Sequence, residues 1–279
     1  MSAESVRQIL GGAAARLGRL TTGRRDAELL LLRAVKRDKA WLLTHADEEL
    51  TTEQIAQFER WVERRARNEP VQYILGEAEF YGLTLRVTPD VLIPRPETEH
   101  VVEAVLSKAG REAAVRICDV GTGSGAIAVA LAHELPRAAV TAVDISPTAL
   151  EIARENAERH RVAGRVRFLE SDLLSAVRKE RFDVVVSNPP YVREDEVLEA
   201  QVRENEPRLA LYAGATGLEV VRRLIPEAWE ALAPGGWLVM EIGQGQREEA
   251  GELLAGWNEV NCKDDLQGIA RVAIAQRGA

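Results

Sequence analysis

The sequence predicts an α/β protein in which a small helical bundle precedes a larger domain built on a mostly parallel β-sheet. Three observations predict this fold class: a helical spacing of apolar residues before residue 70, a proline-rich stretch near residue 90, and short apolar runs that alternate with amphipathic segments after it. Of the 279 residues, 46% are hydrophobic and 29% charged, so the chain can bury a core and extensive disorder is excluded.

The first part of the chain has the periodicity of helices. Apolar residues recur at helical spacing over residues 5–17 and 24–35, and a cap-like Thr-Thr-Glu-Gln run opens a third helix over residues 51–62. Pro70 ends or restarts that third helix, because proline cannot continue a helix interior. We therefore expect a helical bundle over residues 1–75.

A linker follows the bundle. Residues 80–87 read as two short strands that turn at Gly82, and three prolines then make a stiff connector, namely Pro89, Pro94 and Pro96. We expect a β-hairpin and proline-rich linker over residues 76–95.

The last part of the chain, residues 96–279, alternates between strand-like and helix-like segments. The apolar runs that predict strands are residues 115–120, 140–143, 166–169, 184–186, 237–240 and 272–275. The helical stretches between them include residues 127–135, 147–160 and 218–232. Solidly apolar strands that alternate with helices predict a parallel sheet covered on both faces.

A glycine-rich loop follows the first of these strands. Gly121, Gly123 and Ala126 fit the pattern G-x-G-x-x-G/A, in which glycine allows a tight turn and close approach of a ligand to the backbone. Asp144 ends the next strand, where its carboxylate can accept hydrogen bonds from both hydroxyls of a ribose. The pattern predicts a nucleoside cofactor, but it fits NAD as well as S-adenosylmethionine, and a tight turn without a ligand is the structural alternative.

A second acidic residue, Asp172, follows the third strand. Sheets of this type bind ligands beyond the carboxyl ends of their strands, so Asp172 is placed to accept a hydrogen bond from an adenine amino group. The alternative is a helix N-cap, and the two roles can coexist.

The tetrad Asn188-Pro189-Pro190-Tyr191 follows the fourth strand and is the most specific feature of the chain. The prolines restrict the backbone, so the carbonyl group of Pro189 is held in place beside the side-chain oxygen of Asn188. These two acceptors can receive both hydrogens of one planar NH2 group, and Tyr191 offers a flat face on which that group can stack.

Such a site suits methyl transfer to nitrogen. The lone pair of an amide or aryl amine is delocalised, and two acceptors that hold its hydrogens favour a more tetrahedral, nucleophilic nitrogen. Positioning and electrostatics would supply most of the rate, and no strong base is needed. Enzymes that methylate adenine in DNA or RNA share the tetrad with enzymes that methylate a glutamine amide, so the tetrad predicts the reaction and leaves the substrate open.

Further segments of the chain resemble the release-factor glutamine N5-methyltransferase family. They are Glu-Pro-Val-Gln-Tyr-Ile-Leu-Gly at residues 69–76, Phe-Tyr-Gly at residues 80–82, Leu-Ile-Pro-Arg-Pro-Glu-Thr-Glu at residues 92–99, Glu-Pro-Arg-Leu-Ala-Leu at residues 206–211 and Glu-Ile-Gly at residues 241–243. The resemblance covers nearly all of the second domain and its connector. The Pro-Arg-Pro segment is not expected in nucleic-acid adenine methyltransferases.

This resemblance implies a Rossmann-like methyltransferase domain with a seven-stranded, mostly parallel sheet. It implies that S-adenosylmethionine methylates the N5 nitrogen of the Gly-Gly-Gln glutamine in bacterial class I release factors, with S-adenosylhomocysteine as product. The implied catalytic residues are Asn188, Pro189 and Tyr191, which with Pro190 also bind the substrate. The implied cofactor residues are Gly121, Thr122, Gly123, Ser124, Gly125, Asp144, Asp172, Leu173 and Asn188.

The composition of the chain limits which partners it can bind. The net charge of −8 argues against a protein held on nucleic acid by bulk charge, so we expect no stable nucleic-acid binding. No apolar run is long enough to span a membrane and no signal-peptide layout opens the chain. Two cysteines predict free thiols in the cytoplasm, and four scattered histidines predict no metal site. We expect a monomer whose bundle contacts the release factor.

Some readings stay open at this point. Adenine N6-methylation of DNA or RNA is the first rival function, and NAD-dependent hydride transfer or a nucleoside-binding module is the second. Ala213 and Thr216 depart from the family pattern, which leaves their loop in doubt. Arg95 and Glu97 fit a hinge within the linker as well as a substrate contact, and Glu241 fits a strand-end cap as well as a role in the site.

Overall fold

The computed structural model describes residues 5–110 and 114–278. Its contacts divide the chain into two compact units. The first contains the chain up to Gly76 together with Glu199–Asn205, and the second contains Glu77–Leu198 and the chain from Glu206 onward. The chain therefore passes from one unit to the other three times.

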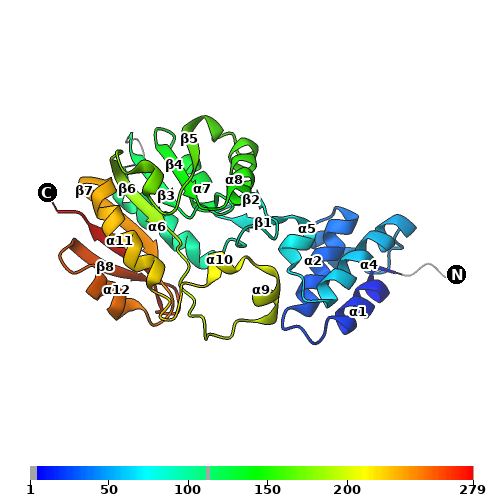
Figure 1. Cartoon of the computed structure of the whole chain (residues 1–279). Helices are drawn as coiled ribbons and strands as arrows, with labels where there is room; N and C mark the ends of the chain where they lie inside the picture. The colour runs from blue at the N-terminus through cyan, green and yellow to red at the C-terminus, as the bar shows by residue number, and fades with distance from the viewer. Residues whose placement is uncertain (1–4, 111–113, 279) are drawn as a thin grey trace. The chain divides into compact units, whose positions relative to one another are not determined.

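The first unit is a helical bundle (Figure 1). Two of its helices begin with a capping box, in which Ser5 pairs with Gln8 and Thr51 pairs with Gln54. The three predicted helices are present as α1 Val6–Arg16, α2 Gly23–Val35 and α4 Thr52–Ala66. Two shorter helices that were not predicted, α3 Lys39–Thr44 and α5 Val71–Leu75, complete the bundle. Fully buried side chains form the core, among them Leu30, Leu31, Phe58 and Val62.

A short helix from far along the chain, α9 (Ala200–Asn205), belongs to this first unit. The buried Arg65 side chain donates to Asp26 Oδ2 at 2.8 Å and to Gln201 Oε1 at 3.0 Å. The Asn205 side chain donates to the carbonyl group of Asn68 at 3.2 Å. Polar contacts thus hold α9 in the unit, although the sequence places this segment within the 96–279 domain.

The second unit opens with the predicted hairpin. Strand β1 (Glu77–Phe80) pairs antiparallel with β2 (Leu83–Arg86). Tyr81 and Gly82 between them have φ values of 50° and 72°, and two-residue hairpin turns favour positive φ at both positions. A 3-10 turn, η1 (Pro96–Thr98), then leads into α6 (Glu99–Lys108).

A seven-stranded sheet forms the centre of the second unit, as the fold class predicted. Its spatial order is β5-β4-β3-β6-β7-β9-β8. The pairs from β5 to β7 are parallel, and β9 is antiparallel to both of its neighbours. The strands are β3 Arg116–Val120, β4 Ala139–Asp144, β5 Val166–Glu170, β6 Phe182–Ser187, β7 Leu232–Glu241, β8 Asn258–Asp264 and β9 Ala270–Gln276.

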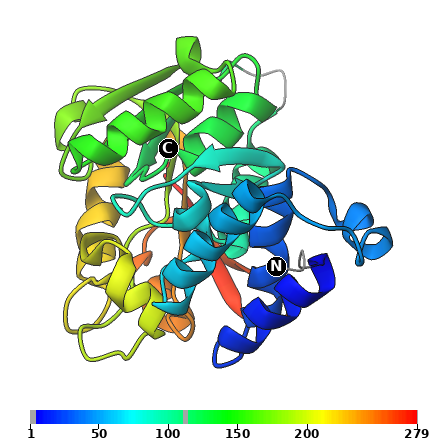
Figure 2. The same ribbon diagram turned by 90° about the vertical axis from the view of Figure 1, so that its right-hand side faces the viewer.

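Helices cover both faces of this sheet (Figures 1 and 2). Two clusters of buried apolar residues form the core, one on each face of the sheet. Ile117 belongs to the first cluster and Cys118 to the second, because successive residues of a strand point to opposite faces. The first cluster packs against α6, α7 (Ala126–Glu134) and α8 (Pro147–Arg159). The second packs against η3 (Ser175–Val177), α11 (Glu219–Ala231) and α12 (Arg247–Leu253). Two shorter elements complete the unit, η2 (Ala163–Arg165) and α10 (Arg208–Leu211).

The strand order reverses at β3. From β3 the chain continues outward to β4 and β5 on one side, whereas β6 and β7 lie on the other. Ligands of doubly wound sheets bind beyond the carboxyl ends of the strands at such a switch point. Within the described parts of the chain, no helix combines the length and apolar character needed to cross a membrane.

Candidate active site

The glycine loop lies at the carboxyl end of β3, as predicted. Gly121, Gly123 and Gly125 have φ values of 70°, 54° and 81°, a region that residues with a Cβ rarely adopt. A Cβ on Gly125 would lie 3.0 Å from the Cβ of Ala153 in α8, so the third glycine permits close packing of the two helices. A Cβ on Gly121 or Gly123 would meet nothing within 4 Å, so the backbone is open to a ligand on that side.

Asp119, the penultimate residue of β3, supports the loop from inside the protein. Its Oδ2 atom accepts hydrogen bonds from the Thr122 hydroxyl at 2.6 Å and from the Ala128 N–H at 3.1 Å. Burial raises the pKa of Asp119 to about 7, although these hydrogen bonds oppose the shift. Its Oδ1 atom is buried and has no hydrogen-bond partner among the described residues. Asp119 was not predicted as a site residue, because its only signal in the sequence is its place two residues before the first glycine.

Asp144 stands at the carboxyl end of β4, beside the loop. Its Oδ2 atom accepts the Gly123 N–H at 2.8 Å and its Oδ1 atom accepts the Ser146 N–H at 2.9 Å. Burial raises the pKa of Asp144, and the backbone hydrogen bonds oppose that shift. Each oxygen keeps lone pairs for further donors, so the carboxylate can still accept ribose hydroxyls.

Asp172 and Leu173 follow β5, the next strand outward. The exposed Asp172 carboxylate accepts a hydrogen bond from Arg223 of α11 at 2.6 Å, so a ligand that used it would compete with that ion pair. Leu173 has a φ of 48° and packs against the second core cluster. Leu173 therefore offers an aliphatic surface at this end of the sheet.

These residues fit an adenosine-type cofactor with a methionine tail. The backbone beside Gly121 and Gly123 is open, Asp144 supplies ribose acceptors, and the carboxyl ends of β4, β3 and β6 are adjacent because these strands pair in that order. The chain thus brings the predicted cofactor residues of β3 and β4 together with those that follow β6. Asp172 and Leu173 extend the same edge past β5.

The tetrad follows directly on β6, whose last residue, Ser187, pairs with Val120 of β3. The Ser187 hydroxyl donates to the Val120 carbonyl group at 2.8 Å, which ties the start of the tetrad to the start of the glycine loop. In the described chain (residues 5–110 and 114–278), neither the Asn188 Oδ1 atom nor the Pro189 carbonyl oxygen receives a hydrogen bond. Both acceptors predicted from the sequence are therefore available to a ligand.

Two residues from outside the tetrad hold its side chains. The Asn188 Nδ2 atom donates to the Thr98 hydroxyl at 3.0 Å, and Thr98 donates to Glu241 Oε2 at 2.6 Å. The Tyr191 hydroxyl donates to Glu241 Oε1 at 3.2 Å. Thr98 was not selected from the sequence, since nothing in its spacing relates it to the tetrad. Glu241, for which the sequence left a strand-end cap and a role in the site as alternatives, contacts the tetrad directly.

The electrostatics of this network follow from its burial. Burial raises the pKa of Glu241 to about 7. Its hydrogen bonds with Thr98 and Tyr191 and the charge of Arg271 lower this pKa, whereas the charge of Glu97 raises it. Burial also raises the pKa of the Tyr191 phenol, and Glu241 raises it further, so Tyr191 stays protonated and acts as the donor.

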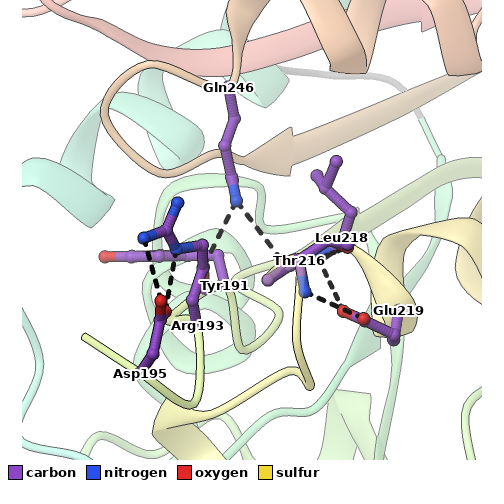
Figure 3. A network of polar contacts seen from close by, with 8 residues as sticks. Tyr191, Arg193, Asp195, Thr216, Leu218, Glu219 and Gln246 are labelled. Atoms are coloured by element: carbon purple, nitrogen blue, oxygen red, sulfur yellow. Dashed lines mark hydrogen bonds and ion pairs between the residues drawn. The ribbon is translucent and has the colours of Figure 1, made fainter.

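Gln246, between β7 and α12, fixes the backbone after the tetrad (Figure 3). Its side-chain nitrogen donates to the carbonyl groups of Tyr191 at 3.2 Å and Gly217 at 3.3 Å, and its oxygen accepts the Gly243 N–H at 2.8 Å. A Cβ on Gly217 would lie 2.4 Å from the Tyr191 carbonyl oxygen, so only glycine allows this approach. In the same figure, Glu219 closes the neighbouring loop by accepting the Thr216 and Leu218 N–H groups.

The Arg95 side chain has a partner within the second unit. It donates to Glu206 Oε1 at 2.5 Å, while Glu206 Oε2 accepts the Ile93 N–H at 3.1 Å. Glu206 is buried, so this pair anchors the proline-rich connector. Of the two roles considered for Arg95, the structure therefore favours the structural link.

The chain is similar to known methyltransferases. Residues 98–210 match the sequence family described as "Methyltransferase small domain", and residues 8–76 match the "PrmC N-terminal domain". A release factor glutamine methyltransferase of Koribacter versatilis is 48% identical over 257 residues, which are 91% of each chain. A protein of the same name from Moorella thermoacetica is 46% identical over 280 residues, covering 98% of this chain and 99% of that one.

Solved structures share the fold. A methyltransferase from Pyrococcus furiosus superposes with a TM-score of 0.52 at 21% identity, over 78% of this chain and 98% of that chain. The T. thermophilus 16S rRNA N2 G1207 methyltransferase, in complex with AdoMet and guanosine, gives a TM-score of 0.54 at 19% identity, over 72% of this chain and 49% of that chain. At such identities the likeness concerns the fold alone.

Proposed function

The chain belongs to the family of release factor glutamine methyltransferases, and we propose that residues 188–191 are the segment that holds the substrate glutamine. The protein is an S-adenosylmethionine-dependent enzyme that methylates the glutamine of a release factor. The predictions of fold class, reaction and cofactor are confirmed, and nothing in the comparisons supports adenine methylation.

One observation carries the assignment of the substrate site. Asn188 Oδ1 and the Pro189 carbonyl oxygen are two acceptors on adjacent residues, and neither is used by another group of the described chain. A glutamine side chain presents one NH2 with two hydrogens. Two acceptors with such a placement match that group and do not match a second carbonyl or carboxylate.

The chemistry follows from holding both hydrogens. S-adenosylmethionine supplies an electrophilic methyl group on a sulfonium. Asn188 Oδ1 and the Pro189 carbonyl oxygen would accept hydrogen bonds from the two N–H groups of the substrate amide. These bonds would weaken the delocalisation of the nitrogen lone pair and orient it for in-line attack on the methyl group. Tyr191 is held by Glu241 and Gln246, so its ring can stack on the planar amide. The surplus proton of the methylated nitrogen leaves to water afterwards, so no strong base is required.

The cofactor residues form the other half of the proposal. Residues 121–125 would line the methionine end, where the backbone near Gly121 and Gly123 is open. Asp144 would hold the ribose, and Asp172 with Leu173 would flank the adenine. Asn188 touches both halves, because it follows the strand that pairs with β3.

The first unit completes the proposal. Residues 1–75 would contact the release factor as a bundle, residues 76–95 would link it to the catalytic domain at 96–279, and the substrate would be a bacterial class I release factor. The mildly basic first 70 residues, set against the acidic remainder, support separate tasks for the two parts. We propose that the enzyme acts in the cytoplasm as a monomer, without stable nucleic-acid binding.

A transfer assay with tritiated S-adenosylmethionine tests this function. Purified release factor, the same factor with its Gly-Gly-Gln glutamine replaced by alanine, and adenine-containing DNA and RNA are offered in parallel. We expect label only in the unaltered release factor. Mass spectrometry should then locate one added methyl group on the motif glutamine. Label in nucleic acid with unlabelled protein would overturn the proposal.

A further inference from the structure

The amide of Asn188 can face its substrate in two ways. Its oxygen and nitrogen ends have nearly the same shape, so a half turn exchanges them without altering the packing. A substrate NH2 needs the oxygen end, because two facing NH2 groups bring donor against donor. The tetrad alone does not determine which end faces the substrate.

Thr98 and Glu241 determine it. The Thr98 hydroxyl lies 3.0 Å from the amide nitrogen of Asn188 and 2.6 Å from Glu241 Oε2. Thr98 is 3% exposed and Glu241 is 2% exposed, so water does not offer either group an easy substitute. The two reach this point from η1 and from the end of β7, which are 143 residues apart in sequence.

The direction of these bonds follows from the proton count. At pH values above the Glu241 pKa of about 7 the carboxylate is ionised and only accepts, so Thr98 gives its one hydroxyl hydrogen to Glu241. The Thr98 oxygen then has only lone pairs left, and it selects the NH2 end of Asn188. Turning the amide would set two acceptors against each other and leave the buried Thr98 oxygen without a donor. The oxygen end of Asn188 therefore points away from Thr98.

Tyr191 steadies the same carboxylate from its other side. Its hydroxyl donates to Glu241 Oε1, so both oxygens of the carboxylate carry a donor from a neighbouring residue. The carboxylate thereby links the first and last residues of the tetrad. A rotation of Glu241 would disturb Asn188 and Tyr191 together.

We propose that Thr98, backed by Glu241, is a positioning residue that sets the donor–acceptor orientation of Asn188 and so selects an NH2 group as the methyl acceptor. The proposal rests on the proposed function, since it assigns to Asn188 the task of accepting a hydrogen from the substrate amide. Thr98 acts through Asn188 and does not itself touch the substrate.

Three variants of the full-length enzyme test this role. Thr98→Val keeps the shape of the side chain and removes its hydroxyl, Thr98→Ala removes the hydroxyl without any crowding, and Thr98→Ser restores the hydroxyl. Each is assayed with release factor for kcat and KM, for S-adenosylhomocysteine affinity by calorimetry, and for melting temperature. Assays run well below the lowest melting temperature, so that all chains compared are folded.

We expect kcat to fall about 10-fold or more in Thr98→Val and Thr98→Ala, because the Asn188 amide is no longer held in the orientation that binds the reacting NH2 group. Affinity for S-adenosylhomocysteine should stay within about twofold of the parent. Thr98→Ser is expected to recover most of kcat. Loss of kcat in the serine variant equal to that in valine, or a kcat in valine and alanine within about twofold of the parent, would overturn the proposal. A parent enzyme that leaves release factor unmethylated would instead overturn the proposed function.

Discussion

The two halves of the proposed active site, one for the cofactor and one for the substrate, are held in different ways. The cofactor half is local, because residues 121–125 make their turn through their own backbone, and the side chains that support them, Asp119 and Asp144, lie on β3 and β4. The substrate half is assembled from distant parts of the chain. Thr98 lies 90 residues from Asn188, and Gln246 lies 55 residues from Tyr191.

This difference teaches where each half is vulnerable. In the cofactor half, conformation is determined by glycine, so a change there acts through the backbone. In the substrate half, rigid prolines set the path of the backbone while side chains from η1 and β7 set the direction of the functional groups. Loss of one such contact changes orientation without removing the motif.

The largest effect should come from the substrate half. Asn188→Ala removes an acceptor for the substrate amide, and we expect kcat to fall about 100-fold, in line with the loss of one preorganised polar group at a reacting centre. Affinity for S-adenosylhomocysteine should stay within about threefold of the parent, as calorimetry would measure. Unchanged turnover would remove the central role of Asn188, and a large loss of cofactor affinity would place that role in the other half.

The next effect concerns the pH dependence of stability. The pKa of Glu241 is raised from 4.5 to about 7 in the folded protein. Protonated Glu241 therefore contributes to the free energy of unfolding, and this contribution is fully present below pH 4.5 and is lost as the pH rises through 7. Glu241→Gln has no proton to lose. From pH 5.5 to pH 8 we expect the variant to gain about 2 kcal/mol of unfolding free energy relative to the parent.

Urea unfolding at the two pH values measures this difference. Asp119, whose pKa is also raised to about 7, is present in both proteins, so its contribution cancels in the comparison. Parallel pH dependences of parent and variant would show that Glu241 is not a buried titrating group of the substrate half.

The smallest effect should come from the cofactor half. Gly123→Ala places a Cβ at a φ of 54°, which costs about 1 kcal/mol, and points it into the open side of the loop. We expect S-adenosylhomocysteine to bind about 5- to 10-fold more weakly, with kcat at saturating cofactor nearly retained. Gly164→Ala is the matched control, because its Cβ would also meet nothing within 4 Å and its φ is not left-handed. Equal affinities in both variants would contradict a ligand at this loop.

Regular elements were predictable where burial leaves a pattern. The strands from β3 to β7 and β9 appear as apolar runs, because both faces of the sheet are covered. The edge strand β8 was not predicted, since all its residues are exposed or half-buried and it contains no apolar run. The short helix α9 was missed for a related reason: it is polar and is held by side-chain contacts with Arg65 and Asn68.

The sequence by itself determined the reaction class, because a glycine loop after one strand and an Asn-Pro-Pro-Tyr segment after another act mainly through local backbone geometry. It also determined the family, through segments spread along most of the chain. Only the tertiary structure decided which end of the Asn188 amide faces Thr98 and which end is left for the proposed substrate. That choice depends on the hydroxyl of Thr98 and the carboxylate of Glu241, which meet only when η1 and β7 are packed together, and no spacing in the chain encodes such a meeting.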